Sequence, residues 1–126
     1  MQIEQREVNG VVILDLHDQF TVDHGVDAFV ERMNALIRQR RRRILLNFEH
    51  VTYLDSAGVG AIAWKYVTAR KQDSDVKLLN LRPRSFKVLN TTKLLTVIPN
   101  FESEAEAIES FLTGGPEDDD VDPIFT

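Results

Sequence analysis

Leu54-Asp55-Ser56-Ala57-Gly58-Val59-Gly60 joins an apolar, strand-like run at positions 44–48 to a helix-like run at 61–70. A serine therefore lies where a strand ends and a helix begins, beside backbone N–H groups that lack partners and carry partial positive charge. Such a position accommodates an anion, including a phosphate attached to the serine itself. The glycines are harder to explain, because each costs a helix about 1 kcal/mol relative to alanine. We therefore expect Gly58 and Gly60 to let a partner or an adjacent loop approach the backbone closely.

The segments around this stretch alternate between strand and helix patterns. Apolar residues recur every three or four positions across 22–37, which predicts a helix with Thr21 and Asp23 as candidate caps. The stretch itself opens a second predicted helix at 56–71, for which Asp55 is a candidate N-cap.

The C-terminal half continues the alternation. Residues 76–81 predict a strand, Pro83 suits the first position of a short helix, and residues 94–98 predict a last strand. Ser103 and Glu106 then form a capping box for a final helix.

The N-terminal residues predict a hairpin. Residues 3–8 are polar and suit an edge strand, and Asn9-Gly10 is the sequence that a type I′ turn requires. The apolar run 11–14 indicates a strand buried on both faces. The whole order predicts an α/β fold with a mixed, mostly parallel sheet, right-handed crossovers and helices packed against it.

Composition restricts the protein's class. The 126 residues suffice for one domain, and no apolar run approaches the roughly 20 residues that span a bilayer. The first residues lack a signal-peptide pattern and the chain has no cysteine, so we expect a cytoplasmic location without direct membrane insertion. Five of the 20 acidic residues lie at 117–122, which leaves 15 acids against 15 Lys and Arg. The balanced remainder gives no reason to expect nucleic-acid binding, and we expect positions 114–126 to be a disordered acidic tail.

Residues 51–62, VTYLDSAGVGAI, resemble the signature of STAS domains, above all that of bacterial anti-sigma factor antagonists, whose motif is Asp-Ser-Ser/Ala-Gly-aliphatic-Gly. The resemblance extends over 78–83 and 86–111, and covers about residues 2–112. It implies a STAS fold, with the domain at 1–113.

The resemblance also implies a switch. In such proteins the serine after the aspartate, here Ser56, is phosphorylated by a GHKL-type (histidine-kinase-like) serine kinase that is also the anti-sigma factor. The unphosphorylated form binds that partner and frees the sigma factor, and a metal-dependent serine phosphatase resets the switch. We expect a monomer or weak dimer, with these partner-binding residues: Asp55, Ser56, Ala57, Gly58, Val59, Gly60, Trp64 and Asp23.

The chain departs from the family pattern in three places. Asn47 replaces the usual acid at the end of the third strand, and Leu16-His17-Asp18-Gln19-Phe20 replaces a Gly-Asp/Glu-aliphatic-Asp motif. We expect both near the partner surface, so they concern the identity of the partner. Lys93 replaces a glycine after the third helix, so this departure affects the C-cap of that helix and not the fold.

Several residues allow two interpretations. Ser56 could simply cap a helix, and Asp55 could either cap it or orient the Ser56 hydroxyl toward a kinase. We expect one face of the second helix to be buried, formed by Val59, Ile62, Ala63, Tyr66 and Val67. Trp64 lies on another face, either buried or exposed as an interface anchor.

Other classes of function find little support. A nucleophile elbow needs glycine two positions before the serine, where this chain has Leu54, so we expect no enzyme. No P-loop lysine follows the glycines, and the three histidines lack metal-ligand spacing, so we expect neither cofactor nor metal. Within the STAS family, the alternatives are a cytoplasmic subunit of a lipid-transport ABC transporter and a stressosome scaffold.

A run of arginines, Arg38 and Arg40 to Arg43, follows the first predicted helix. It could bind nucleic acid or acidic lipid headgroups, but we expect a solvated helix end whose cations complement the helix dipole. The acidic tail could also fold back on it, in a manner sensitive to salt.

Overall fold

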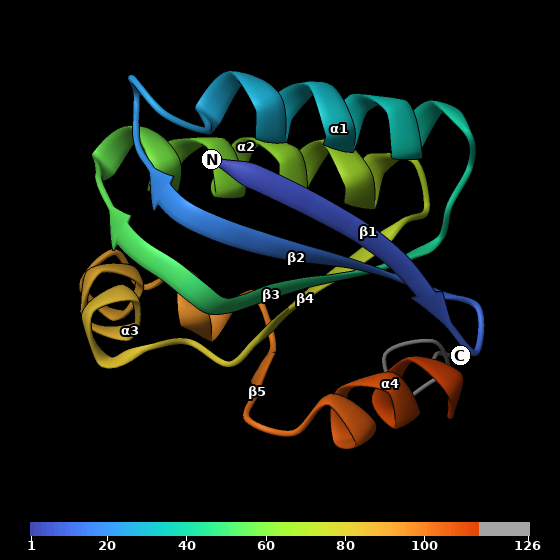
Figure 1. Cartoon of the computed structure of the whole chain (residues 1–126). Helices are drawn as coiled ribbons and strands as arrows, with labels where there is room; N and C mark the ends of the chain where they lie inside the picture. Colours follow the sequence, from blue (N-terminus) through green and yellow to red (C-terminus); the bar gives the residue numbers. More distant parts are fainter. Residues whose placement is uncertain (114–126) are drawn as a thin grey trace.

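One five-stranded sheet organises the chain (Figure 1), of which this computed structural model describes residues 1–113. The strands lie in chain order across the sheet. They are β1 (Gln2–Val8), β2 (Val11–Phe20), β3 (Arg43–Leu54), β4 (Asp75–Leu79) and β5 (Asn100–Phe101). β1 pairs with β2 in antiparallel fashion and all other pairs are parallel, which confirms the mixed, mostly parallel sheet.

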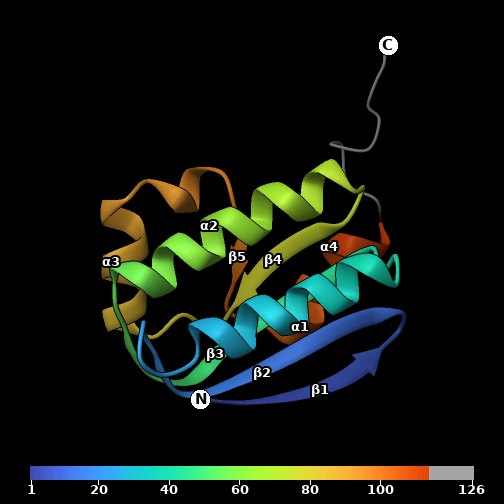
Figure 2. The same ribbon diagram turned by 90° about the horizontal axis from the view of Figure 1, so that it is seen from above.

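The helices lie on both faces of this sheet. They are α1 (Val26–Arg38), α2 (Ser56–Lys71), α3 (Pro83–Thr91) and α4 (Glu104–Leu112), with a 3₁₀ turn, η1 (Leu94–Thr96), after α3. α1 and α2 lie side by side over one face, and α4 covers part of the other (Figures 1 and 2). Within residues 1–113, no helix combines the length and the apolar character needed to cross a membrane.

The sheet divides the core into two clusters. The larger one lies between the sheet and the α1/α2 layer and includes Leu14, Phe20, Phe29 and Ile62. The smaller one gathers Val11, Ile13, Leu45 and Leu79 with the buried side of α4, Ala107, Ile108 and Phe111. Strand β2 contributes to both, because successive side chains point to opposite faces, and its first four residues are at most 1% exposed.

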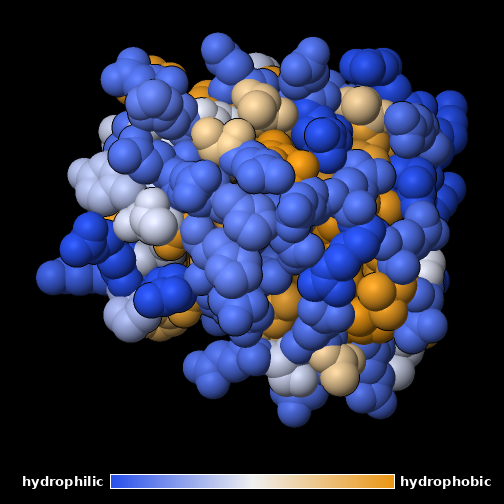
Figure 3. Space-filling model, viewed as in Figure 1, coloured by the Kyte–Doolittle hydropathy of each residue, from blue (hydrophilic) through white to orange (hydrophobic). Residues whose placement is uncertain are grey.

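The predicted hairpin is confirmed. Asn9 and Gly10 have φ angles of 52° and 82°, the positive values that a type I′ turn needs at both central positions. The turn leaves β1 as an edge strand whose charged side chains form ion pairs with neighbouring elements. Arg6 of β1 pairs with Asp15 and Glu104, and Glu7 of β1 pairs with Arg41. Figure 3 shows this side of the molecule as mainly hydrophilic, with small separate apolar areas.

The predicted start of the first helix is wrong by four residues. α1 begins at Val26 rather than at 22, and neither Thr21 nor Asp23 caps it. Residues 21–24 instead form a turn, closed by the N–H of Thr21 on the carbonyl of His24 at 2.7 Å. Gly25 then turns the chain into the helix at φ 113°, where a Cβ atom would lie 2.9 Å from the Gln19 carbonyl oxygen.

The predicted strand at 94–98 is also wrong. Lys93 adopts the left-handed conformation at φ 67° and starts the 3₁₀ turn η1, so the short strand β5 forms only after Pro99. The turn is closed by the Thr96 hydroxyl, which donates to the Lys93 carbonyl at 2.6 Å. A short apolar run does not distinguish a strand from a helical segment by its pattern alone. The left-handed backbone at Lys93 agrees with the glycine usual there in the resembling family.

Candidate functional site

Asp55 holds the start of α2 in place. It is the N-cap residue, and its Oδ1 accepts the N–H of Gly58 at 2.9 Å, so the predicted cap is confirmed. Its Oδ2 accepts the N–H of Val22 at 3.1 Å, which ties the loop after β2 to the same carboxylate. Desolvation opposes ionisation of this group, but the hydrogen bonds from Gly58, Val22 and Ala57 outweigh it and hold the pKa of Asp55 below its usual value.

Ser56 is the first residue of α2 and is exposed. Its hydroxyl makes no hydrogen bond with any residue of the described part of the chain, so Asp55 and not Ser56 is the cap. The helix N-terminus beside it offers partial positive charge. The hydroxyl therefore has no partner among residues 1–113 and lies at a helix end that favours negative charge.

The two glycines differ in their surroundings. A Cβ atom on Gly58 would lie 2.5 Å from the Phe20 carbonyl oxygen and 2.7 Å from Leu54 Cδ1. Gly58 is therefore needed so that the end of β2 can pack against α2. A Cβ atom on Gly60 would meet nothing within 4 Å among the described residues, and Gly60 is exposed. Only the second glycine presents bare backbone outward.

The outer face of α2 carries an aromatic side chain. Trp64 is 58% exposed, so its side chain is not buried. With Ser56 and Gly60 it forms a row at four-residue spacing along one helix face. Val67 is 50% exposed, so its predicted place on the buried face of α2 is wrong.

Lys65 explains why the buried face of α2 differs from the predicted one, which included Val67. It is only 4% exposed and donates to Asn34 Oδ1 on α1 at 2.7 Å, while its Nζ lies 3.8 Å from the centroid of the Trp64 ring. Burial lowers the pKa of Lys65. A lysine whose stem is buried and whose head is bonded can occupy the α1/α2 contact, which turns Trp64 and Val67 outward.

The predicted partner-binding residues thus divide into exposed and packed groups. Asp23, Ser56, Gly60 and Trp64 are exposed, Asp55 and Ala57 are half-buried, and Gly58 and Val59 are buried. Sequence reasoning missed Val22, which is 65% exposed and whose N–H binds Asp55. No sequence signal marks it, because the interaction uses its backbone and joins residues far apart in the chain.

Asn47, which we expected near the partner surface, has a buried side chain in β3. It is 5% exposed, and it shares with Leu45 the sheet face opposite α1 and α2. Its Nδ2 donates to Asp15 Oδ1 at 2.8 Å, and its Oδ1 accepts from the Glu49 N–H and from Asn80. Desolvation acts to raise the pKa of Asp15, but the hydrogen bonds from Arg6 and Asn47 outweigh it, so the pKa lies below its usual value. An amide at position 47 supplies both the donor for Asp15 and the acceptor for Glu49 and Asn80. An acid at this position would instead place a second carboxylate against Asp15.

The replaced motif at positions 16–20 lies partly at the site and partly in a neighbouring pocket. Leu16 and Phe20 are fully buried, and the Phe20 carbonyl accepts the Asp55 N–H at 3.3 Å. His17 stacks on His50 of β3, with ring centroids 4.9 Å apart and planes 5° from parallel.

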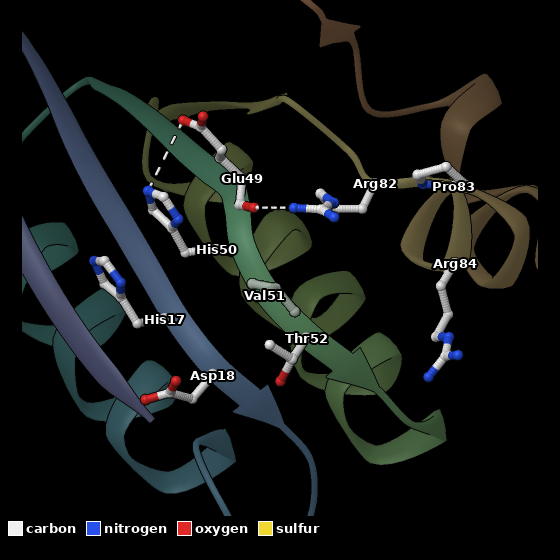
Figure 4. A pocket seen from close by; sticks show the side chains of 9 residues that line it. All are labelled: His17, Asp18, Glu49, His50, Val51, Thr52, Arg82, Pro83 and Arg84. Atoms are coloured by element: carbon white, nitrogen blue, oxygen red, sulfur yellow. Dashed lines mark hydrogen bonds and ion pairs between the residues drawn. The ribbon is translucent and has the colours of Figure 1, made fainter.

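That pocket has a volume of about 740 Å³ (Figure 4). Figure 4 shows the two histidine rings side by side along β2 and β3, with Arg82 reaching the Glu49 carbonyl from the start of α3. Arg82 and Arg84 are balanced there by Asp18 and Glu49, so the pocket presents no excess charge that would select an anion. Among residues 1–113, no group of three or more His, Cys, Asp or Glu is arranged to hold a metal ion.

Comparison with known proteins connects this geometry to one family. The sequence model of the STAS domain matches residues 2–107. An anti-sigma F factor antagonist from Paenibacillus polymyxa is 24% identical over 110 residues, which are 86% of this chain and 92% of that protein.

Solved structures share the fold. That of a proposed anti-sigma factor antagonist from Thermotoga maritima superposes with a TM-score of 0.80 at 19% identity, covering 86% of this chain and 92% of that one. The Bacillus cell fate determinant SpoIIAA in its phosphorylated form gives a TM-score of 0.69 at 24% identity, covering 87% and 99%.

Proposed function

Because this chain belongs to the STAS domain family, we propose that it is an anti-sigma factor antagonist controlled by phosphorylation of Ser56. The observation that carries the proposal is the exposed Ser56 hydroxyl, which begins α2 without a hydrogen bond to a described residue. Support comes also from a relative named as an anti-sigma F factor antagonist and from a similar fold solved in a phosphorylated form.

The unphosphorylated form binds its partner through the outer face of α2 and the adjoining loop. Trp64 supplies the apolar anchor, and the exposed backbone at Gly60 allows close approach. The contact surface comprises the exposed Asp23, Ser56, Gly60 and Trp64 with the half-buried Asp55 and Ala57, while Gly58 and Val59 are buried and support it from inside. The partner is an anti-sigma factor that is also a GHKL-type serine kinase, and its capture releases a sigma factor.

Phosphorylation ends this interaction through charge. A phosphate adds about −1.5 to −2 charge at pH 7. In the free protein the N-terminus of α2 stabilises it. In the complex it must lose water beside Asp55, whose lowered pKa keeps that carboxylate ionised at neutral pH. Both desolvation and like-charge repulsion then oppose binding, and a metal-dependent serine phosphatase restores it.

The protein is a non-enzymatic regulator in this proposal and acts in the cytoplasm. Ser56 is modified by its partner and performs no chemistry of its own. Leu54 stands where a nucleophile elbow requires glycine.

The test uses a candidate GHKL-type kinase of the source organism with Mg-ATP, followed by mass spectrometry and calorimetry. Ser56→Ala is expected to remain bound and unphosphorylated, whereas Ser56→Asp is expected to bind weakly. Thr52→Ala is the matched control, because it removes an exposed hydroxyl from the nearby end of β3. Phosphate on another residue, or equal affinity of wild type and Ser56→Asp, would contradict the proposal.

A further inference from the structure

Four arginines gather at the end of the molecule farthest along α2 from Ser56. We call Arg38, Arg40, Arg42 and Arg43 the arginine pole; they occupy the end of α1, the turn after it and the first position of β3. All four are exposed, and their side chains have no hydrogen bond or ion pair with residues 1–113. Arg41, by contrast, pairs with Glu7, and Arg70 on α2 pairs with Asp75.

The backbone holds these arginines in a defined arrangement. The N–H of Arg41 donates to the Leu36 carbonyl at 3.1 Å, and that of Arg40 to the Ile37 carbonyl at 3.0 Å. This pair of bonds is a Schellman motif, in which the residue at the position of Arg40 is usually glycine because its φ is positive. Arg40 accepts φ 59° there, so the chain keeps a cation where backbone strain favours glycine.

The pole also borders a groove between α1 and α2. The groove has a volume of about 550 Å³ and is lined by Asn34, Ile37, Arg38, Arg40, Thr68 and Gln72. Its lining contains two cations and no acid. It therefore suits a narrow, negatively charged segment.

The described chain ends near this pole. Phe111 of α4 packs in one cluster with Val8 and Val11, which flank the hairpin turn. A Cβ atom on Gly10 in that turn would lie 3.8 Å from Arg43 Nη1. Figures 1 and 2 both show the C-terminal end of α4, the hairpin and the turn after α1 at the same end of the molecule.

The part of the sequence beyond residue 113 has the complementary charge and sufficient length. Acids stand at 117–120 and at 122. An extended chain spans at most about 3.6 Å per residue, so the first of these acids can reach roughly 14 Å from Thr113 and the last roughly 32 Å. The predicted tail at 114–126 lies outside the described residues.

We propose that the acidic segment at 117–122 binds the arginine pole of its own chain. The segment offers five carboxylates to four guanidinium groups that have no acidic partner in the described structure. Hydrogen bonds between arginine and a carboxylate are charge-assisted and therefore stronger than neutral ones. The short tether supplies a high effective concentration. This interaction involves neither Ser56 nor its partner, so it stands or falls separately from the proposed function.

A spin label on the full chain tests this directly. The sequence has no cysteine, so Ile124→Cys carries a single nitroxide. Near 0.1 M salt, where the screening length is about 10 Å, the label is expected to reduce the NMR signals of the Gly10 and Arg40–Arg43 amides. The loss should disappear at 1 M salt, where the screening length is about 3 Å.

Three further variants carry the same label. Neutralising the tail with Glu117→Gln, Asp118→Asn, Asp119→Asn, Asp120→Asn and Asp122→Asn should restore the signals, as should Arg38→Gln with Arg42→Gln and Arg43→Gln. Lys87→Gln with Lys93→Gln, which removes exposed cations in and just after α3, should leave the signal loss intact.

Three results would overturn the proposal. One is signal loss that persists in the neutral-tail variant, and another is signal loss centred on α3. The third comes from mixing ¹⁵N-labelled protein without nitroxide with spin-labelled ¹⁴N protein. Signal loss at the arginine pole in that mixture would assign the segment to a second copy.

Discussion

The carboxylate of Asp55 binds the N–H of Val22 at 3.1 Å across 33 positions of sequence. The same carboxylate caps α2 through Gly58, so one side chain fixes both the serine that begins the helix and the loop that faces it. Ser56 thus follows a carboxylate that joins two segments of the chain, and both of its hydrogen bonds are strongest when it is ionised.

Asp55→Ala should lower the free energy of unfolding at neutral pH by about 1–2 kcal/mol, because it removes a helix cap and a second backbone hydrogen bond. The pKa of Asp55 is lowered in the folded state. Its contribution is therefore complete above the unfolded value of about 3.9 and is lost as the pH falls through the folded pKa. Urea unfolding of wild type and variant across this range should show the difference shrinking toward acid.

Asp23→Ala is the control, since Asp23 is an exposed acid in the loop that contains Val22 and has no side-chain hydrogen bond to a described residue. Its effect should be within about 0.5 kcal/mol. A stability difference for Asp55→Ala that does not change with pH would contradict the role assigned to the charge.

Gly58→Ala and Gly60→Ala should have opposite effects on stability. A Cβ atom at Gly58 would lie 2.5 Å from the Phe20 carbonyl oxygen, and such overpacking costs about 1–3 kcal/mol. A Cβ atom at Gly60 meets nothing within 4 Å among the described residues, so alanine should stabilise the helix by about 1 kcal/mol. Thermal unfolding distinguishes the two, and destabilisation by Gly60→Ala would refute the prediction.

Asn47→Asp should destabilise the protein by about 1–3 kcal/mol at neutral pH, because it places a carboxylate against Asp15 and loses an amide donor. The new acid would have a raised pKa in the folded state. The part of its penalty that comes from the charge should therefore shrink as the pH falls through this raised pKa and be gone below the unfolded value of about 3.9.

The exchange Asp15→Asn with Asn47→Asp is the matched rescue, since it restores one donor and one acceptor between the two side chains. Denaturant titrations at pH 7 should show the double variant more stable than Asn47→Asp alone. If the two are equally stable, the amide contact is not what selects asparagine at this position.

Trp64→Ala should weaken partner binding by about 2 kcal/mol, which is roughly 30-fold in Kd, and should leave stability almost unchanged because Trp64 is 58% exposed. Trp64 is the single tryptophan of the chain, so its fluorescence emission should shift to shorter wavelength on binding. Phe86→Ala is the control, since Phe86 is an exposed aromatic on α3. Equal affinities of wild type and Trp64→Ala would exclude this face of α2 from the interface.

Local chemistry accounts for what could be predicted from the sequence. The Asn9-Gly10 turn, the bounds of α2 at 56–71, the Asp55 cap and the Ser103 cap all depend on residues within a few positions of one another. The strand and helix order followed from hydrophobic period, except at 94–98, where a left-handed Lys93 turned an apolar run into a 3₁₀ segment.

Contacts between distant segments decided the rest. The motif marks Gly58 and Gly60 alike, yet only Gly58 is enclosed, because the end of β2 passes against it and not against Gly60. The Val22 partner of Asp55, the Asp15 partner of Asn47 and the Asn34 partner of Lys65 all come from other strands, loops or helices. The residues of one segment encode its periodicity and caps, but the groups that it meets across the core are set only when the sheet and its helices pack.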